Sequence, residues 1–292
     1  MQKIIPFLWF DGNAIEAMNF YTSIFQNSKI MNIMYYGEAG PEPEEKVMSA
    51  TFKLARQQFT ALNGGPEFTF TPAISFFVNC ETIEEIDALW DNLLDDGTVL
   101  IELGKYPISE KFGWIQDKLG VSWQLNLTKI EQKICPFLMF VGQQKWKAEE
   151  AIEFYMSIFD NSEIIEMLHY GPGEEEPAGT VKRARFSLNG QEFMAIDSNR
   201  EHEFDFTPAI SFFVNCKTQE EIDILWEKLS DKGEKQRMGW LTDKYGISWQ
   251  VIPSILDEML KDKDPDKSKR VMEAMMKMDK MDIKKFKQAY EG

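Results

Sequence analysis

Histidine, the most common general base of nucleophilic triads, is scarce in this chain. Its 292 residues contain two histidines, His169 and His202. A serine nucleophile needs a neighbouring base, but Ser75 and Ser211, which lie in strand-like segments, have no histidine near them in the sequence. The motifs therefore give no evidence of a nucleophilic triad.

Methyl transfer from adenosylmethionine is a second chemistry to consider. It would need a glycine-rich loop between a strand and a helix of a βαβ unit, where backbone N–H groups hold the cofactor. No Gly-x-Gly-x-x-Gly loop follows a predicted strand, and residues 63–66 (NGGP) have the composition of a turn. We therefore expect no methyltransferase activity.

Composition narrows the classes of partner. With 32 Lys and Arg against 48 Asp and Glu, the net charge is −16. Nucleic acids and anionic membrane surfaces attract basic proteins, so we expect neither as a partner. No apolar run reaches the roughly 18 residues that a membrane span needs. Three cysteines without metal-like spacing indicate a reducing cytoplasm; they are Cys80, Cys135 and Cys216.

A repeat of about 130 residues organises the sequence. The segment TPAISFFVNC occurs at residues 71–80 and again at residues 207–216, and Trp90 returns as Trp226. A period of this length indicates a duplicated domain. We predict domain 1 over residues 1–130, domain 2 over residues 131–253 and a C-terminal helical extension over residues 254–292.

Each repeat contains two modules with the element order βαβββ. In the first module, an apolar strand over residues 4–10 precedes a helix over residues 14–25, where apolar residues recur at helical spacing. The second module starts with a strand over residues 73–79. Thr82 and Glu85 then have the spacing of a capping box before a helix.

The repeats differ in two places. The second has four extra residues near residues 143–147, and it lacks ten residues between Gly233 and Gly239. After them, Pro265 and Asp282 are predicted to start two helices that carry a methionine stripe. Such a stripe either packs on the protein's own body or offers a peptide-binding face, and the sequence favours packing.

These features resemble the vicinal oxygen chelate superfamily, which includes glyoxalase I, extradiol dioxygenases and bleomycin resistance proteins. The resemblance rests on residues 10–13 (FDGN), on Phe20 and Tyr21 in the following helix, and on residues 120–124 (GVSWQ). It is greatest for the PhnB-like group and covers both repeats.

The resemblance implies an α+β fold. Two tandem glyoxalase-like domains are expected, each of paired βαβββ modules that form a curled eight-stranded sheet, followed by a C-terminal helical tail. The sequence leaves open whether residues 1–65 pair within their own repeat or with residues 207–253.

The resemblance also implies where a metal would lie. Metal-dependent members place one His, Glu or Gln from each of four strands in the concave face. The corresponding positions here are Pro6, Ala61, Ala73 and Gln124 in the first repeat, and Pro136, Ala195, Ala209 and Gln250 in the second. Pro and Ala side chains have no donor atoms, and a divalent ion needs three or more ligands. We therefore predict no metal site.

Strand alternation from these positions predicts what lines the concave faces instead. An aromatic lining with a few amides and hydroxyls is typical of sites for small organic molecules. The expected lining is Phe10, Phe59, Asn63, Ser75, Phe77 and Gln124 in the first repeat, and Phe140, Phe193, Asp197, Ser211, Phe213 and Gln250 in the second. Five tryptophans are expected between sheets and helices: Trp9, Trp90, Trp123, Trp226 and Trp249.

We therefore predict a PhnB-like protein without metal or other cofactor that binds a small, mainly apolar organic molecule, with Gln124 or Gln250 as polar anchor. Asp197 is a candidate general base if it lies in an apolar cup; a structural carboxylate is the alternative. The duplication is expected to replace a homodimer, so that a monomeric chain holds an internal pseudo-twofold axis.

Two other functions stay open at this stage. One is a lyase or dioxygenase whose metal is held by other residues. The other is a structural or interaction protein whose concave faces are filled by their own phenylalanines. The sequence defines no catalytic residue and favours binding over catalysis.

Overall fold

The computed structural model describes residues 3–36, 43, 45–128 and 133–292. One group of strands, which forms sheet A, comprises β1 (Ile4–Phe10), β2 (Lys29–Tyr35), β3 (Val47–Leu54), β4 (Gln57–Asn63), β13 (Ile210–Cys216), β14 (Glu234–Lys235), β15 (Trp240–Thr242) and β16 (Ser248–Pro253). The other group, which forms sheet B, comprises β5 (Ile74–Cys80), β6 (Thr98–Tyr106), β7 (Ser109–Gln116), β8 (Ser122–Leu127), β9 (Lys133–Phe140), β10 (Glu163–His169), β11 (Val181–Leu188) and β12 (Gln191–Asp197).

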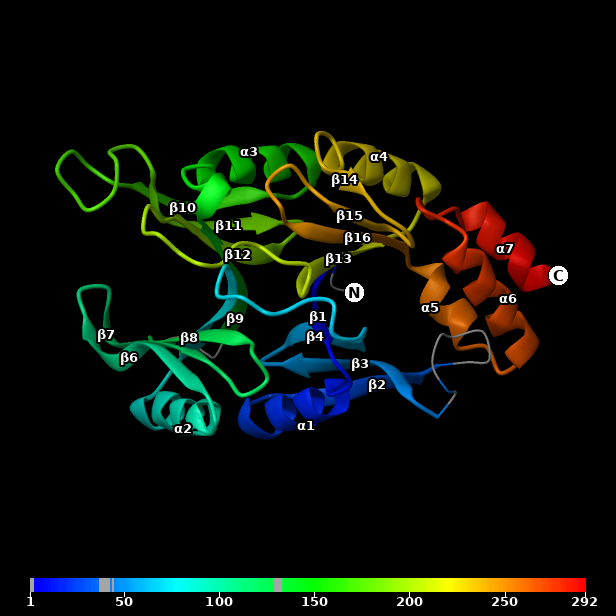
Figure 1. Ribbon diagram of the computed structural model, residues 1–292, viewed down its shortest axis with the longest axis horizontal. Helices are drawn as coiled ribbons and strands as arrows, with labels where there is room; N and C mark the ends of the chain where they lie inside the picture. Colours follow the sequence, from blue (N-terminus) through cyan, green and yellow to red (C-terminus); the bar gives the residue numbers. More distant parts are fainter. Residues whose placement is uncertain (1–2, 37–42, 44, 129–132) are drawn as a thin grey trace.

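Each eight-stranded sheet joins strands from both repeats (Figure 1). In sheet A, β1 pairs antiparallel with β13, with Phe7 opposite Ser211. In sheet B, β5 pairs antiparallel with β9, with Ser75 opposite Phe137. The modules are thus exchanged between the repeats, which is one of the two arrangements that the sequence left open. The boundary expected at residue 130 lies outside the described residues.

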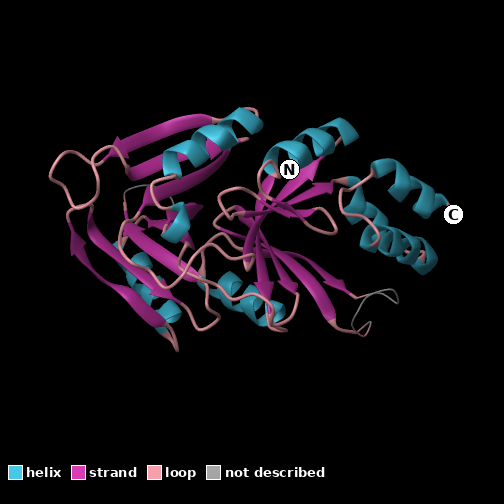
Figure 2. Cartoon of the chain, turned by 45° about the horizontal axis from the view of Figure 1, so that its top comes forward, coloured by secondary structure: helices cyan, strands magenta, loops and turns pink. Residues whose placement is uncertain are grey.

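Both sheets are mixed, and their strand orders are equivalent. Sheet A has the order β14-β15-β16-β13-β1-β4-β3-β2, and sheet B has the order β10-β11-β12-β9-β5-β8-β7-β6. Figure 2 shows the strands of both sheets fanned and curled between outer helices. The predicted α+β fold with paired βαβββ modules is therefore confirmed.

Four helices cover the outer faces: α1 (Ala14–Ile24), α2 (Ile83–Leu94), α3 (Ala148–Ile158) and α4 (Gln219–Leu229). As predicted, Thr82 caps α2, because its hydroxyl accepts a hydrogen bond from the Glu85 N–H at 3.1 Å. Thr218 caps α4 in the same way. The four extra residues of the second repeat lie around a short 3-10 helix, η1 (Gly142–Gln144), before α3.

The main core lies between the helices and the sheets. At its centre in the first repeat, the Trp123 ring lies 5.2 Å from Tyr21 and 5.3 Å from Phe76, between ring centroids. The buried carboxylate of Asp117 accepts hydrogen bonds from the Tyr21 hydroxyl at 2.7 Å and from the Trp123 indole N–H at 2.8 Å. This carboxylate therefore ties α1 to the start of β8.

The second repeat contains the same buried carboxylate at Asp243. It accepts hydrogen bonds from the Tyr155 hydroxyl at 2.7 Å, from the Trp249 indole at 2.8 Å, and from the backbone N–H groups of Tyr245 and Ile247. Burial nevertheless raises the pKa of Asp243 from 3.8 to about 6, and the four hydrogen bonds act in the opposite direction. Desolvation of the carboxylate therefore raises its pKa by more than the four hydrogen bonds lower it.

Three helices form the tail: α5 (Ile255–Leu260), α6 (Pro265–Met276) and α7 (Ile283–Glu291). Asp282 caps α7 as predicted, accepting from the Lys285 N–H at 3.1 Å. Met278 and Met281 are buried against the body of the protein, so packing is the alternative that the structure supports. No helix within the described ranges is both long and apolar enough to cross a membrane.

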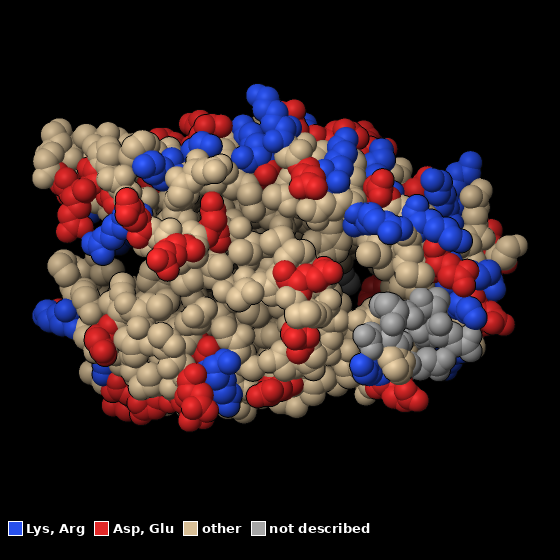
Figure 3. Space-filling view, viewed as in Figure 1, with Lys and Arg blue, Asp and Glu red and all other residues tan. Residues whose placement is uncertain are grey.

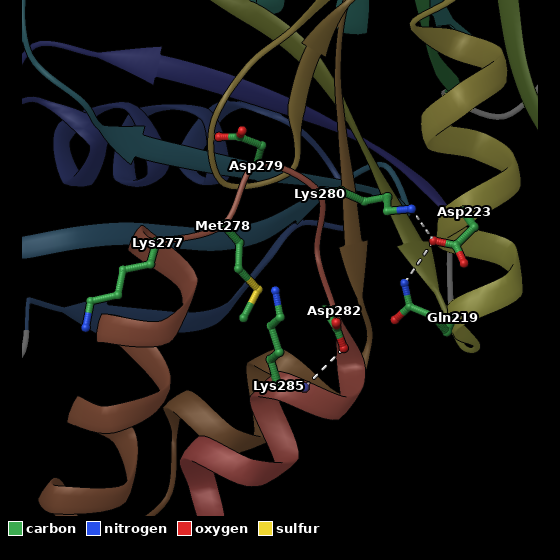
Figure 4. A pocket seen from close by; sticks show the side chains of 8 residues that line it. All are labelled: Gln219, Asp223, Lys277, Met278, Asp279, Lys280, Asp282 and Lys285. Carbon is green, nitrogen blue, oxygen red and sulfur yellow. Dashed lines mark hydrogen bonds and ion pairs between the residues drawn. The ribbon is translucent and has the colours of Figure 1, made fainter.

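A side chain of α4 holds the tail in place. The Gln219 amide accepts from the Ile283 N–H at 2.8 Å and donates to the Met281 carbonyl at 3.1 Å. Beside it, Lys280 forms an ion pair with Asp223 at 2.8 Å. Figure 4 shows these side chains around a cavity of about 520 Å³ between α4 and the tail.

Candidate functional site

Each sheet has one face against the helices and one concave face free of them. On β1, Leu8 belongs to the main core, so Phe7 lies on the other face. We call the helix-free faces of sheets A and B cup A and cup B. Strand register carries the assignment across each sheet, because paired residues share a face.

The two cups have equivalent linings. In cup A these are Ile5, Phe7, Trp9, Thr51, Thr60, Leu62, Ser211, Phe213, Trp240, Gln250 and Ile252. In the same order of equivalence, cup B has Cys135, Phe137, Met139, Arg185, Met194, Ile196, Ser75, Phe77, Trp114, Gln124 and Asn126.

An apolar cluster separate from the main core lies in cup B. Its buried members come from β9, β12 and the residue after β9, and Phe77, Trp114 and Ile196 pack against them. The Phe77 and Phe137 rings are stacked with centroids 6.2 Å apart. The three packing side chains keep part of their surface exposed, so they form an accessible apolar wall.

Two side-chain hydrogen bonds cross the apolar floor of cup B. The Gln124 amide donates to the Ser75 hydroxyl at 2.9 Å, and the Asn126 amide donates to the Asn79 carbonyl oxygen at 2.9 Å. Within the described part of the chain, the buried indole N–H of Trp114 has no partner. Cup B thus combines aromatic surface with neutral polar groups.

Cup A has more aromatic side chains than cup B, and it contains the same hydrogen-bonded pair of a glutamine and a serine. Phe7 stacks on Phe213 at 6.5 Å, and Trp240 meets the edges of Phe7 and Trp9 at 5.8 Å each, between centroids. The Gln250 amide donates to the Ser211 hydroxyl at 3.0 Å. Both predicted glutamine anchors therefore occupy the same place in their cups.

The surroundings of the cups differ. In sheet A, Met238 and Gly239 donate backbone hydrogen bonds to the carbonyls of Met278 and Asp279 in the tail, at 2.8 and 2.7 Å. The tail thus occupies the side where the second repeat is ten residues shorter. In sheet B, the long β6–β7 hairpin lies there instead, and Figure 3 shows a hollow beside it, below the loop that follows β10.

Half of the predicted lining residues lie on the other face of the sheets. Ser75, Phe77, Gln124, Ser211, Phe213 and Gln250 lie in the cups. Their predicted companions lie on the helix-covered face: Phe10, Phe59, Asn63, Phe140, Phe193 and Asp197. Trp9 was expected between sheet and helices but lies in cup A, in contact with Trp240. These positions are corrected.

The error has a physical reason. A register one residue off moves every side chain of a strand to the opposite face, and the sequence of β1 offers no check. This strand (IIPFLWF) is buried on both faces, so it reads as a continuous apolar run without alternation. The same holds for β9.

The side chains of Asn63 and Asp197 accept hydrogen bonds from backbone N–H groups at the starts of neighbouring elements. The side-chain oxygen of Asn63 (Oδ1) accepts a hydrogen bond from the Ala14 N–H, at the start of α1, at 2.8 Å. The Asp197 carboxylate accepts from Ala148 at the start of α3 and from Val181 at the start of β11, at 3.1 and 2.9 Å. Burial raises the Asp197 pKa, but both carboxylate oxygens are engaged by the backbone.

The residues present do not fit a divalent metal ion. Pro6 and Ala61 lie on the helix-covered face, and their neighbours in cup A, Phe7 and Thr60, offer at most one weak neutral ligand. No group of three His, Cys, Asp or Glu side chains able to hold a metal occurs in the described ranges. His169 pairs with Glu149 in an exposed contact, and His202 contacts Ser198.

The fold places the protein in a known class. Two curled sheets of paired βαβββ modules form a glyoxalase-like fold, as predicted. Glyoxalase I from Zea mays has a similar fold: it is 10% identical with a TM-score of 0.56, and the match covers 85% of this chain and 90% of that one.

Sequence comparison gives the family. The family described as 3-demethylubiquinone-9 3-methyltransferase matches residues 2–126 and 132–252, and the chain belongs to it. A solved structure titled putative 3-demethylubiquinone-9 3-methyltransferase, PhnB protein, from Bacillus cereus is 53% identical; the match covers 44% of this chain and all of that chain, with a TM-score of 0.41. A Pseudomonas aeruginosa protein is 26% identical over 44% of this chain and 98% of its own, with a TM-score of 0.38. No curated protein matches.

Proposed function

We propose that the protein binds a small, mainly aromatic organic molecule in its cups, and that cup B is the principal site. The observation that carries this proposal is the separate apolar cluster of cup B. Soluble proteins seldom keep contiguous apolar surface outside their core unless it has a binding role. Here that surface is concave, aromatic and crossed by neutral polar groups, as in sites for small ligands.

The polar groups give such a ligand an orientation. The Gln124 side chain uses one N–H to reach Ser75, and an amide has a second N–H and a carbonyl oxygen. A ligand stacked over Phe77 and Phe137 would therefore find a hydrogen-bond donor and an acceptor beside its rings. Gln250 offers the same groups in cup A.

A metal-dependent lyase or dioxygenase is supported less well, because neither cup supplies a set of ligands for the ion. Methyl transfer, which the name of the family suggests, also lacks a site. The glycine turn at residues 63–66 is occupied by Trp9, whose indole N–H donates to the Gly65 carbonyl at 2.8 Å. A side chain at Gly64 would collide with the Trp9 ring. This turn serves packing and does not hold a nucleotide.

The test uses 2-acetylnaphthalene, a neutral aromatic ketone, and isothermal titration calorimetry. Replacing Gln124 and Gln250 by Ala in one chain should raise its Kd about fivefold, the effect of losing one hydrogen bond of about 1 kcal/mol. Gln288→Ala, which removes an exposed glutamine from the tail, is the matched control. Absence of binding to the unmodified protein, or equal binding by the double variant, would contradict the proposal.

A further inference from the structure

The wall of cup B carries an arginine and a glutamate at two positions where cup A has uncharged residues. Arg185 on β11 lies opposite Met194, a buried member of the cup B cluster. The Arg185 guanidinium is 3.7 Å from the Glu192 carboxylate, which also pairs closely with Lys133. Two positive charges thus share one negative charge at this wall. Further along β11, Arg183 forms two hydrogen bonds with Glu166 and is fully paired.

A separate observation places these charges at the cup. The pKa of the Cys135 thiol is raised to about 12, mainly by burial and next by the charge of Glu192, while the charges of Lys133 and Arg185 act to lower it. Cys135 belongs to the apolar cluster of cup B. All three charged groups therefore act on the interior of the cup and not on solvent alone.

Cup A has an uncharged residue at two of these three places. Thr51 stands where Arg185 stands in cup B and contacts Thr60 at 3.3 Å. Gln58 occupies in cup A the position of Glu192. Lys3 occupies the position of Lys133 and forms an ion pair with Glu221 of α4. The two cups thus share their glutamine anchor and differ at the positions of Arg185 and Glu192, although they descend from one repeated unit.

We propose that Arg185 is the anion anchor of cup B, so that this cup binds aromatic carboxylates more tightly than neutral aromatic molecules of the same shape. The inference rests on the function proposed above. Among the described residues, the guanidinium forms one ion pair, with Glu192 at 3.7 Å, which is too long for a hydrogen bond and leaves N–H donors for a ligand. Guanidinium groups bind carboxylates through two parallel hydrogen bonds. The aromatic part of the ligand would lie over Met194 and Phe137.

The local charge matters because the whole chain carries −16. An anionic ligand is repelled by such a protein at long range, so its binding requires a local cationic anchor. The Arg185 side chain is 42% exposed. It is therefore accessible to a ligand that enters cup B.

The experiment compares 2-naphthoate with 2-acetylnaphthalene, which has the same ring system and no charge. Arg185→Thr copies the residue of cup A and should raise the Kd of 2-naphthoate about tenfold, as expected for loss of a charge-assisted hydrogen bond. The Kd of the neutral ketone should change by less than about twofold, because its contacts are apolar and amide contacts. Added salt should weaken binding of the anion alone.

Lys182→Thr is the matched control. It removes one positive charge from the same strand, three residues before Arg185, at an exposed position that points to the opposite face. An equal loss in both variants, or no loss in Arg185→Thr while both probes bind, would overturn the anchor. If neither probe binds the unmodified protein, the proposed function itself fails.

Discussion

The buried carboxylate of Asp243 gives a prediction about stability and pH. Its pKa is raised from 3.8 to about 6 by burial, so the folded protein holds this proton more tightly than the unfolded chain does. The group's contribution to stability is fully present below pH 3.8 and is lost as the pH rises through about 6. The difference between the two pKa values corresponds to about 3 kcal/mol of unfolding free energy.

The perturbation is Asp243→Asn, which removes the titration and keeps the size of the side chain. The variant loses an acceptor for Tyr155 and Trp249, so its stability shifts at every pH. What tests the reasoning is the difference between the two proteins as the pH changes. Between about pH 7.5 and about pH 4.5, the unmodified protein should gain about 2 kcal/mol relative to the variant.

Urea unfolding followed by tryptophan fluorescence, at a series of pH values, measures this difference. The titrations of the other carboxylates are common to both proteins and cancel in it. Parallel pH profiles would refute the raised pKa. A difference of opposite sign would mean that the four hydrogen bonds to the carboxylate outweigh its desolvation.

Two further predictions follow from the fold. Phe59 is buried in the main core between sheet and helix, so Phe59→Ala should cost about 3–5 kcal/mol of stability and leave the Kd of 2-acetylnaphthalene unchanged; Phe77→Ala, in cup B, should weaken binding and cost less stability. A reversed result in urea unfolding and calorimetry would contradict the assignment of faces. Gln219→Ala removes the two hydrogen bonds that hold residues 281–283 of the tail, so hydrogen exchange in α7 should accelerate about tenfold. Unchanged exchange would show that buried Met281 anchors the tail alone.

The repeat made the architecture predictable from the sequence. An identical decapeptide and the matching helix caps define four βαβββ modules, and Thr82 and Asp282 start their helices as expected. Module exchange could not be predicted in this way. Strands β5 and β13 have the same sequence, so each offers the same edge to β1 and to β9, and pairing energies do not distinguish the two arrangements.

The candidate site was predictable only where strands have one polar face. On β5 and β8, Ser75 and Gln124 alternate with apolar residues, and strand register and their hydrogen bond place both on the face of cup B. On β1 and β9, both faces are apolar and the assignment of Phe10 and Phe140 was wrong. The sequence did not indicate that Arg185 lies at a binding site, because only the strand register places it beside the apolar cluster of cup B.

A crystal structure of the protein soaked with 2-acetylnaphthalene tests the central claim most directly. The account predicts electron density for the probe in cup B, over the rings of Phe77 and Phe137 and within hydrogen-bond distance of Gln124. Density under the helices beside Phe59, or no density in either cup at a saturating concentration of probe, would contradict it.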